Sequence, residues 1–368
     1  MTQKVIDWIR LSRTENIGPI TFYKLLNRFG SAKAALEQLP EMARNGGKSH
    51  FNLYPVDAAE RELSAIEKLG GFLLLKDDLA YPNLLKQTRD APPILSGLGD
   101  KTLLESEKSI AIVGSRNASL NGLHIAKGLA QNLGTNGYTI VSGLAKGIDA
   151  AAHVGSIDTG TIAVLGGGID VVYPKENATL YKKIKEKGLI LSEFFMGEQP
   201  QAHHFPRRNR IIAGLCSGVV IVEATSKSGS MSTASHAADY GRDVFAVPGS
   251  PLDPRSQGPN LLIKNGAVLV ESSLDITNNQ PFTFEAWEED PEQYFPHSGP
   301  ISKNLKEIRE KVLGLLSTSP CHIEDLIIQL GVSPSIISDV LLELELAGGL
   351  QRLRENKVSL KPYHKTPF

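Results

Sequence analysis

The sequence predicts an α/β fold whose centre is a doubly wound, mainly parallel sheet, with a small helical domain before it and a winged-helix domain after it. Short runs rich in Val, Ile and Leu recur between residues 109 and 270, and most end in glycine or a small polar residue. Segments of helical period separate most of these runs. This alternation is typical of parallel sheets that are covered by helices on both faces.

The strands of this sheet can be assigned from the apolar runs. We expect them at residues 109–113, 138–142, 161–165, 189–192, 218–223, 243–247 and 267–270. Helical periods are clearest at 120–133, 178–187 and 230–240. Parallel α/β sheets bind ligands beyond the carboxyl ends of their strands. The glycine-rich turns follow the strands, so we expect the functional site at that edge.

The first 65 residues are predicted to form short helices. Apolar residues between Trp8 and Leu36 recur at helical spacing, and Gly18-Pro19 and Gly30-Ser31 interrupt them. The stretch 14–30 also fits a helix-hairpin-helix, a module that binds the DNA backbone. The alternative is a small helical bundle used only for packing.

The C-terminal region is predicted to be a winged helix behind a polar linker. Helical periods at 305–316, 323–330 and 334–347 precede a basic, strand-like end. The helix that would read DNA contains Asp339, Glu343 and Glu345 and no lysine or arginine, so phosphates would repel it. We therefore expect a protein-docking or packing module. The predicted domains are residues 1–65, 66–277, 278–300 (the linker) and 301–368.

Composition limits the possible functions. The chain has 368 residues, 41% of them hydrophobic, and a formal net charge of -1, so nucleic acid could bind only at a local basic patch. We find no apolar run of membrane-spanning length and no secretory signal pattern, and we expect a cytoplasmic protein. Cys216 and Cys321 lie far apart, without the spacing of a zinc site.

The strongest electrostatic signal is the segment 205–210, which reads Phe-Pro-Arg-Arg-Asn-Arg. Pro206 suits the first turn of a helix. Cations at a helix N-terminus oppose the macrodipole, so these arginines are unfavourable there unless an anion neutralises them. We interpret that anion as phosphate, in nucleic acid. The alternative is pairing with internal acids such as Glu193 or Glu223.

Other turns at the same edge offer phosphate ligands. Gly114, Ser115 and Arg116 follow the first strand and supply a tight turn, a hydroxyl donor and a bidentate fork, although this could be turn chemistry alone. The run Ser228-Gly229-Ser230 opens a helix and could cradle phosphate or act as an ordinary N-cap.

The remaining polar residues of this edge have less specific interpretations. Lys175 could reach the edge, with Tyr173 as a stacking surface. Asp149 could be a helix cap and Lys146 a solvated loop lysine. His203 and His204 have no carboxylate at ligand spacing, so we expect no metal site there.

A dinucleotide cofactor is disfavoured. The run 166–168 is Gly-Gly-Gly, but position 171 is Val where the fingerprint requires a third glycine or alanine. No acidic residue ends the second strand to hold a ribose. We expect no cofactor.

These motifs together resemble the DNA-processing protein A family (DprA, also called Smf). The resemblance spans roughly residues 75 to 275. No single matching block is specific to the family, but all of them together are. Cys216 stands where the family pattern usually has Ser. The matching blocks are 113–116, 142–145, 147–153, 173–174, 176–177, 205–206, 208–212, 228–230, 233–234, 241–244, 246–249 and 258–263.

The resemblance implies a dimeric, non-catalytic protein with an extended Rossmann-like core. Such proteins hold incoming single-stranded DNA during natural transformation and help to load the RecA recombinase onto it. A homodimer, single-stranded DNA and RecA are the implied partners. The implied DNA site consists of Gly114, Ser115, Arg116, Lys175, Arg208, Asn209, Arg210, Ser228, Gly229 and Ser230.

The alternative is an enzyme that acts on a free nucleotide, such as an N-glycosidase of the related cytokinin-activating (LOG-like) fold. Those enzymes carry Pro-Gly-Gly-x-Gly-Thr-x-x-Glu, and the glutamate performs the chemistry. Here the corresponding helix start is 228–233, which reads Ser-Gly-Ser-Met-Ser-Thr, and no Glu follows.

Overall fold

The computed structural model describes residues 2–106, 108–279, 305–353 and 355–361. Its contacts divide the chain into two compact units. One contains residues 1–59 and 287–368, and the other contains residues 60–286. Within the described ranges, no helix is both long and apolar enough to cross a membrane.

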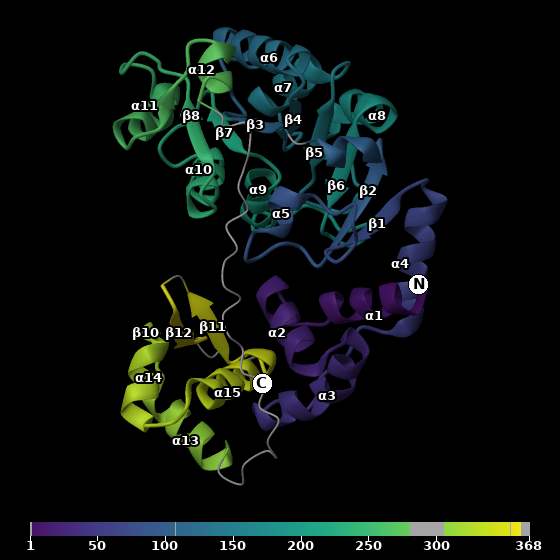
Figure 1. The fold of residues 1–368 in the computed structure, drawn as a ribbon, viewed down its shortest axis with the longest axis vertical. Coiled ribbons are helices and arrows are strands. Elements are labelled where there is room, and N and C mark those ends of the chain that lie inside the picture. Colours follow the sequence, from purple (N-terminus) through teal and green to yellow (C-terminus); the bar gives the residue numbers. More distant parts are fainter. Residues whose placement is uncertain (1, 107, 280–304, 354, 362–368) are drawn as a thin grey trace. The chain divides into compact units, whose positions relative to one another are not determined.

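The second unit contains one sheet, in which the described residues form nine strands ordered β1-β2-β6-β5-β4-β3-β7-β8-β9 (Figure 1). The strands from β3 onward run parallel to one another, whereas β2 pairs antiparallel with both β1 and β6. The predicted doubly wound, mainly parallel sheet is therefore confirmed. The strands are β1 (Phe72–Leu75), β2 (Ile94–Gly99), β3 (Ser109–Val113), β4 (Thr139–Ser142), β5 (Thr161–Val164), β6 (Leu189–Ser192), β7 (Gly218–Ile221), β8 (Asp243–Ala246) and β9 (Val268–Leu269).

Strands β1 and β2 were not predicted from the sequence, which reads there as an irregular connection. Pro92-Pro93 and two glycines in β2 weaken its strand pattern. The structure gives a packing reason for Gly97. A Cβ at this position would lie 2.2 Å from Cζ of Phe72, so the aromatic ring on β1 occupies the space of the missing side chain.

Helices cover both faces of the sheet (Figure 1). Ile110 and Ile112 of β3 pack into the cluster under α6 and α7, while Ala111 and Val113 pack into the opposite cluster with α9 and α10. Burial on both faces explains why these strands read as continuous apolar runs. The helices of this unit are α5 (Asn83–Lys86), α6 (Leu120–Thr135), α7 (Ile148–Ser156), α8 (Ala178–Lys187), α9 (His204–Gly214), α10 (Gly229–Asp239), α11 (Gln257–Lys264) and α12 (Ser273–Thr277), with 3-10 turns η1 (Lys101–Glu105), η2 (Lys175–Asn177) and η3 (Pro254–Ser256).

The first unit combines the N-terminal helices with a winged helix. The N-terminal helices are α1 (Thr2–Arg13), α2 (Pro19–Phe29) and α3 (Ala32–Asn45). Gly30 ends α2 in the left-handed conformation, with φ 75°. The winged helix confirms the predicted C-terminal domain. It contains α13 (Leu305–Leu315), α14 (Ile323–Leu330), α15 (Pro334–Leu346) and strands β10 (Cys321–His322), β11 (Leu350–Leu353) and β12 (Lys357–Leu360) in the order β10-β12-β11.

The predicted domain boundaries remain predictions. Helix α4 (Val56–Lys68) runs through the boundary placed after residue 65 and through the division between the two compact units. Most of the predicted linker, from residue 280 onward, lies outside the described residues.

The loops after β3 and β4 meet at Gly147. This glycine precedes α7 with φ 76° and ψ -124°, a conformation that side chains disfavour. A Cβ there would lie 2.2 Å from the carbonyl oxygen of Ser115. The amide of Ile148 donates to that same oxygen over 3.2 Å. Gly147 therefore allows the two loops to touch through their backbones.

We predict that Gly147→Ala lowers the free energy of unfolding by about 2 kcal/mol or more, because it adds both strain and a clash. Gly128→Ala is the matched control, since Gly128 lies within α6 and its Cβ would meet no atom within 4 Å. It should raise stability by roughly 0.5 to 1 kcal/mol. Urea denaturation followed by circular dichroism measures both, and equal effects would contradict the account of Gly147.

Candidate functional site

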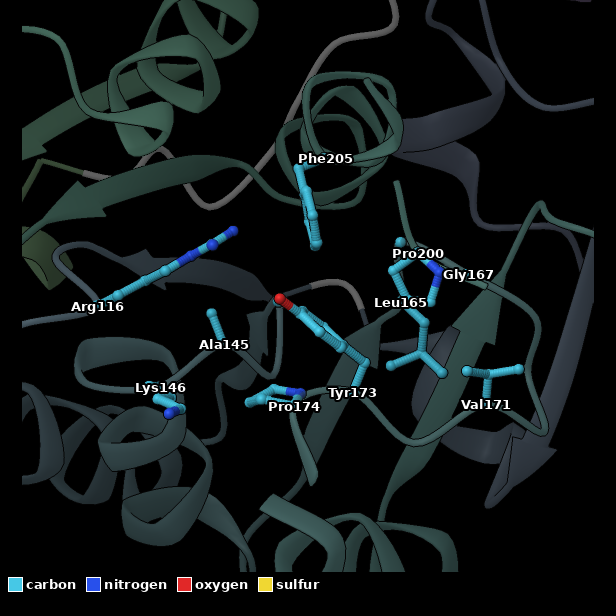
Figure 2. Close-up of a pocket in the computed structure, with 12 residues that line it drawn as sticks. Arg116, Ala145, Lys146, Leu165, Gly167, Val171, Tyr173, Pro174, Pro200 and Phe205 are labelled. Carbon is cyan, nitrogen blue, oxygen red and sulfur yellow. The ribbon is translucent and has the colours of Figure 1, made fainter. Parts of the chain in front are cut away.

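Three loops at the carboxyl edge of the sheet form one pocket (Figure 2). They follow β3, β4 and β5 and are joined by the segment before η2 and the start of α9. The space between the lining residues, including the part that is open to solvent, is about 490 Å³. The lining residues are Arg116, Gly143, Ala145, Lys146, Leu165, Gly166, Gly167, Val171, Tyr173, Pro174, Pro200 and Phe205.

An exposed guanidinium and two aromatic rings face one another in this pocket. Figure 2 shows Arg116, Tyr173 and Phe205 directed toward a common space. Cζ of Arg116 lies 4.8 Å from the centroid of the Phe205 ring, and the two rings have centroids 5.8 Å apart. Within the described residues, no carboxylate lies within ion-pair distance of Arg116. The group therefore presents a cation beside aromatic faces, and both are accessible to a ligand.

The rim of the pocket contains further cations. Lys146 lines the pocket and forms an ion pair with Glu176, and both side chains are exposed. Lys175 is also exposed, but it lies in η2 outside the lining residues. These groups add positive potential near the pocket without closing it.

Arg208 lies beneath the pocket rather than in it. Its residue is only 4% exposed, and Nη1 donates to the carbonyl oxygen of Val164 over 2.6 Å. A Cβ at position 143 would lie 1.9 Å from Nη1, so any larger residue there would displace the guanidinium. Burial lowers the pKa of Arg208 to about 10, and Arg116 acts in the same direction, while Asp149 raises it. The group remains a cation at neutral pH.

Asp149 is the buried acid that partly balances this charge. It lies in the first turn of α7 and accepts from the amide of Ala145 over 3.4 Å. Burial raises the pKa of Asp149, whereas Arg208 and the backbone amides of Ala145, Gly114 and Gly143 lower it. Asp149 is therefore not the expected cap of α7, whose N-cap is Gly147; its carboxylate instead holds the loops that follow β3 and β4.

His153 is neutral in this buried layer. Its Nδ1 lies 2.7 Å from the hydroxyl of Thr161, which itself donates to the carbonyl oxygen of Ile140. Nδ1 must therefore carry the proton, and Nε2, which has no hydrogen-bond partner in the described part of the chain, keeps its lone pair. Burial, followed by the charge of Arg208, lowers the pKa of His153 to about 3.

Two arginines of α9 lie beside the same internal acid. Arg210 forms a buried ion pair with Glu193 and also donates to the carbonyl oxygen of Asp90. Arg207 lies 3.6 Å from the same carboxylate. Glu193 directly follows β6, which places it beside the start of α9. The pairing with Glu193 that the sequence offered as an alternative is thus present at Arg207 and Arg210.

Glu223 has another role. It follows β7, the strand that lies next to β3 in the sheet. Its carboxylate accepts from the backbone amide of Ser119 over 2.9 Å, and it also accepts from the hydroxyl of that residue. Ser119 in turn caps α6 by accepting from the amide of Gly122. This acid therefore fixes the start of a helix and does not pair with α9.

The predicted residues 209 and 228–230 join α9 to α10. Asn209 donates to the carbonyl oxygen of Gly229 over 3.0 Å and to the hydroxyl of Ser232 over 2.9 Å. The Ser228 hydroxyl accepts from the amide of Ser230 over 3.4 Å, so the N-cap interpretation holds. These residues are not among those that line the pocket of Figure 2.

His204 supports the pocket wall. Its Nδ1 lies 3.1 Å from the carbonyl oxygen of Gly166, and its ring stacks on Phe194 with centroids 4.4 Å apart. Nε2 lies 3.3 Å from the carboxylate of Glu198. The described residues contain no group of three or more His, Cys, Asp or Glu side chains placed to hold a metal.

The structure therefore brings together only part of the predicted site. Arg116 lines the pocket, Arg208 lies under it, and Gly114 and Ser115 belong to the loop that carries Arg116. The ring of Phe205 was not predicted to be a wall of the pocket. Its position at the start of a helix, beside the arginines, was the available signal.

Comparison with known proteins identifies all three regions. The family model described as DNA recombination-mediator protein A matches residues 72–281. A DprA-like N-terminal HHH domain matches residues 2–65, and a DprA winged helix domain matches residues 296–356.

Individual relatives agree with these models. The chain is 49% identical to DNA processing protein DprA of Streptococcus pneumoniae over 57% of this chain and 74% of that protein. It is 36% identical to Protein Smf of Escherichia coli over 84% of this chain and 83% of that protein.

Two solved structures are also similar. DNA processing protein A from S. pneumoniae has a TM-score of 0.65 and 35% identity, over 77% of this chain and 99% of that one. DNA processing protein A from Helicobacter pylori, for which a unique single-stranded DNA binding mode is described, has a TM-score of 0.53 and 32% identity, over 56% of this chain and 94% of that one. The chain belongs to the DNA recombination-mediator protein A (DprA/Smf) family.

Proposed function

We propose that this protein binds single-stranded DNA in the pocket of Figure 2 and acts as a recombination mediator without chemistry on the DNA. The observation that carries this proposal is the exposed guanidinium of Arg116 over the ring of Phe205, with Tyr173 beside them. The similarity to the H. pylori protein supports the choice of ligand.

The geometry suits one unstacked nucleotide. A base can stack on Phe205 or Tyr173, because every base offers an aromatic face. The guanidinium of Arg116 can then bind a neighbouring phosphate through paired hydrogen bonds. A base within a duplex is already stacked and paired, so entry into the pocket would require its extrusion, which costs a few kcal/mol. The pocket should therefore prefer single strands and discriminate weakly among sequences.

The other predicted residues have supporting roles in this proposal. Gly114 and Ser115 shape the turn that carries Arg116, and Lys175 attracts the backbone from the rim. Arg208 adds a buried positive charge under the pocket and supports the loop at Gly143. Asn209, Arg210, Ser228, Gly229 and Ser230 act by fixing α9, whose first turn presents Phe205.

We infer that the protein is not an enzyme. The helix that begins at Ser228 lacks the glutamate of the N-glycosidases. Two carboxylates near the pocket are engaged: Asp149 is buried and accepts from the amide of Ala145, and Glu176 pairs with Lys146. Release of free base from nucleoside monophosphates by the purified protein would contradict this inference.

Family membership supports the finer parts of the proposal. We infer that the protein works in the cytoplasm during natural transformation or recombination, protects incoming DNA and loads RecA onto it. Faster assembly of RecA filaments on single strands already coated by a single-strand-binding protein would test the loading step directly.

We predict that Arg116→Ala weakens binding to an oligo-dT strand roughly tenfold at low salt, because a charge-assisted contact is lost. The slope of log affinity against log salt should fall by about 0.7. Phe205→Ala should weaken binding by a similar or larger factor and leave the slope unchanged, since stacking releases no counterions. Fluorescence anisotropy at several salt concentrations measures both quantities.

Arg255→Ala provides the matched control for charge. Arg255 is paired with Asp253 and lies outside the pocket lining, so its removal should change affinity by less than Arg116→Ala does. Equal losses in the two variants would show that the protein attracts DNA only through its general charge, and would refute the pocket.

We also infer a homodimer formed through the β9 edge of the sheet. In the described residues β9 is the last strand in the order, so its outer side has no partner strand. Leu269 on β9 and Leu261 on α11 are 42% and 43% exposed, so both leave apolar surface for a partner to cover. A dimer would place two pockets on one DNA strand and increase avidity.

We predict that Leu261→Asp combined with Leu269→Asp converts the dimer to a monomer, because burying two carboxylates at the interface is unfavourable. Light scattering coupled to gel filtration measures the mass. Leu79→Asp, at another exposed leucine, is the control and should leave the mass unchanged. A wild-type monomer, or an unaltered dimer in the double variant, would contradict this interface.

A further inference from the structure

Helix α15 of the winged helix packs against the N-terminal helices within the first unit. Asp339 accepts from Nη1 of Arg28, on α2, over 2.6 Å. Glu345 accepts from the hydroxyl of Thr21, also on α2, over 3.2 Å. These side chains come from segments more than 300 residues apart in the sequence, so the contact joins two domains of one chain.

The third acid of α15 lies deepest in this contact. Glu343 is 6% exposed and accepts from the side-chain amide of Asn45 over 3.4 Å. Arg309 of the winged helix neutralises Glu343, and Arg352 neutralises Glu345. The carboxylates are thus compensated inside the protein, by their own domain and by the N-terminal helices.

The backbones also approach closely. A Cβ at Gly46, which follows α3, would lie 2.1 Å from the carbonyl oxygen of Glu343. The side-chain amide of Asn16 donates to the carbonyl oxygen of Leu346 over 3.1 Å, which satisfies one of the free carbonyls at the end of α15. Such contacts need a defined docking geometry and are not a chance meeting of charged surfaces.

The docked elements are the chain's two candidates for duplex binding. Asn16 and Thr21 flank the turn at Gly18-Pro19, the hairpin that a helix-hairpin-helix would present to a DNA backbone. Helix α15 follows α14 in the position of a recognition helix, which would enter a major groove. In the structure each element contacts the other.

We propose that α15 is a protein-docking helix whose partner is the N-terminal helical domain of the same chain, residues 14–46, and that docking withholds both elements from duplex DNA. The three carboxylates of α15 favour this partner over a phosphate backbone. DNA binding is then left to the pocket of the other unit. The docking contact itself does not depend on the function proposed for that pocket.

Charge reversal in the full-length protein tests the contact. Hydrogen exchange followed by mass spectrometry is measured on peptides that cover 334–346 and 14–30. Arg28→Glu and Asp339→Arg should each speed exchange in both peptides roughly fivefold or more, because a part-buried ion pair becomes a repulsion. The double variant with both changes restores opposite charges and should return exchange toward the wild-type rate.

Arg44→Glu is the matched control, because Arg44 lies on α3 and its side chain donates to the carbonyl oxygen of Pro40 in the same helix. It should leave exchange in 334–346 unchanged. Unaltered exchange in both single variants, or no recovery in the double variant, would overturn the proposal. Protection that grows with protein concentration would also overturn it, since α15 would then dock on a second copy.

Hydrogen exchange measured with a blunt-ended DNA duplex present tests whether docking withholds both elements from duplex DNA. Exchange in 14–30 and 334–346 of the wild-type protein should not change when the duplex is added. Slower exchange in either peptide would show that the duplex reaches it, and would refute the masking. Binding of single strands is measured in parallel, and its failure with α15 still protected would refute only the function proposed for the pocket.

Discussion

The site depends on a guanidinium that is buried under the carboxyl ends of the parallel strands. Arg208 is almost fully removed from solvent, yet its pKa of about 10 keeps it charged. A buried cation is tolerated only where acceptors and an opposite charge compensate it. Val164 supplies a carbonyl acceptor and Asp149 supplies the negative charge. Both residues also belong to the framework of the loops above, so neutralising the charge also positions the pocket.

This arrangement divides the cations of the site into two kinds. Arg208 and Arg210 are internal, and the carbonyl and carboxylate groups around them hold α9 in place. Arg116 comes from a different loop and faces solvent beside Phe205. A polyanion can therefore use Arg116 directly, while the buried pair contributes potential and rigidity. The first turn of α9 is consequently a structural support for the pocket as much as a charged surface.

The sequence predicted the framework well because local chemistry determines it. The parallel strands from β3 to β8 lie within two residues of their expected bounds. Strands that are buried on both faces of a parallel sheet read as continuous apolar runs, which makes them easy to locate in a sequence. The position of Arg116 at the carboxyl edge followed from the same rule. Strands β1 and β2 were missed because Gly97 and the prolines before β2 obscure their pattern, and only the packing of Phe72 explains the glycine.

The electrostatics of α9 could not be settled from sequence. Glu193 can pair with Arg210 only because the end of β6 lies beside the start of α9. That arrangement depends on the tertiary fold and cannot be read from the local sequence. The acidic character of α15 did indicate protein contacts, but its partner on α2 lies more than 300 residues away. The ring of Phe205 likewise became a candidate stacking surface only from the structure, in which the guanidinium of Arg116 lies over it.

Photo-crosslinking tests the central claim most directly, because it reports which residues touch a bound base. Oligo-dT carrying a single 5-iodouracil is irradiated with the full-length protein, and the modified peptides are identified by mass spectrometry. The pocket account predicts adducts on Tyr173 or Phe205, with loss of the Phe205 adduct and weaker labelling of Tyr173 in Phe205→Ala. Adducts confined to other parts of the chain, with neither ring modified in the wild-type protein, would contradict it.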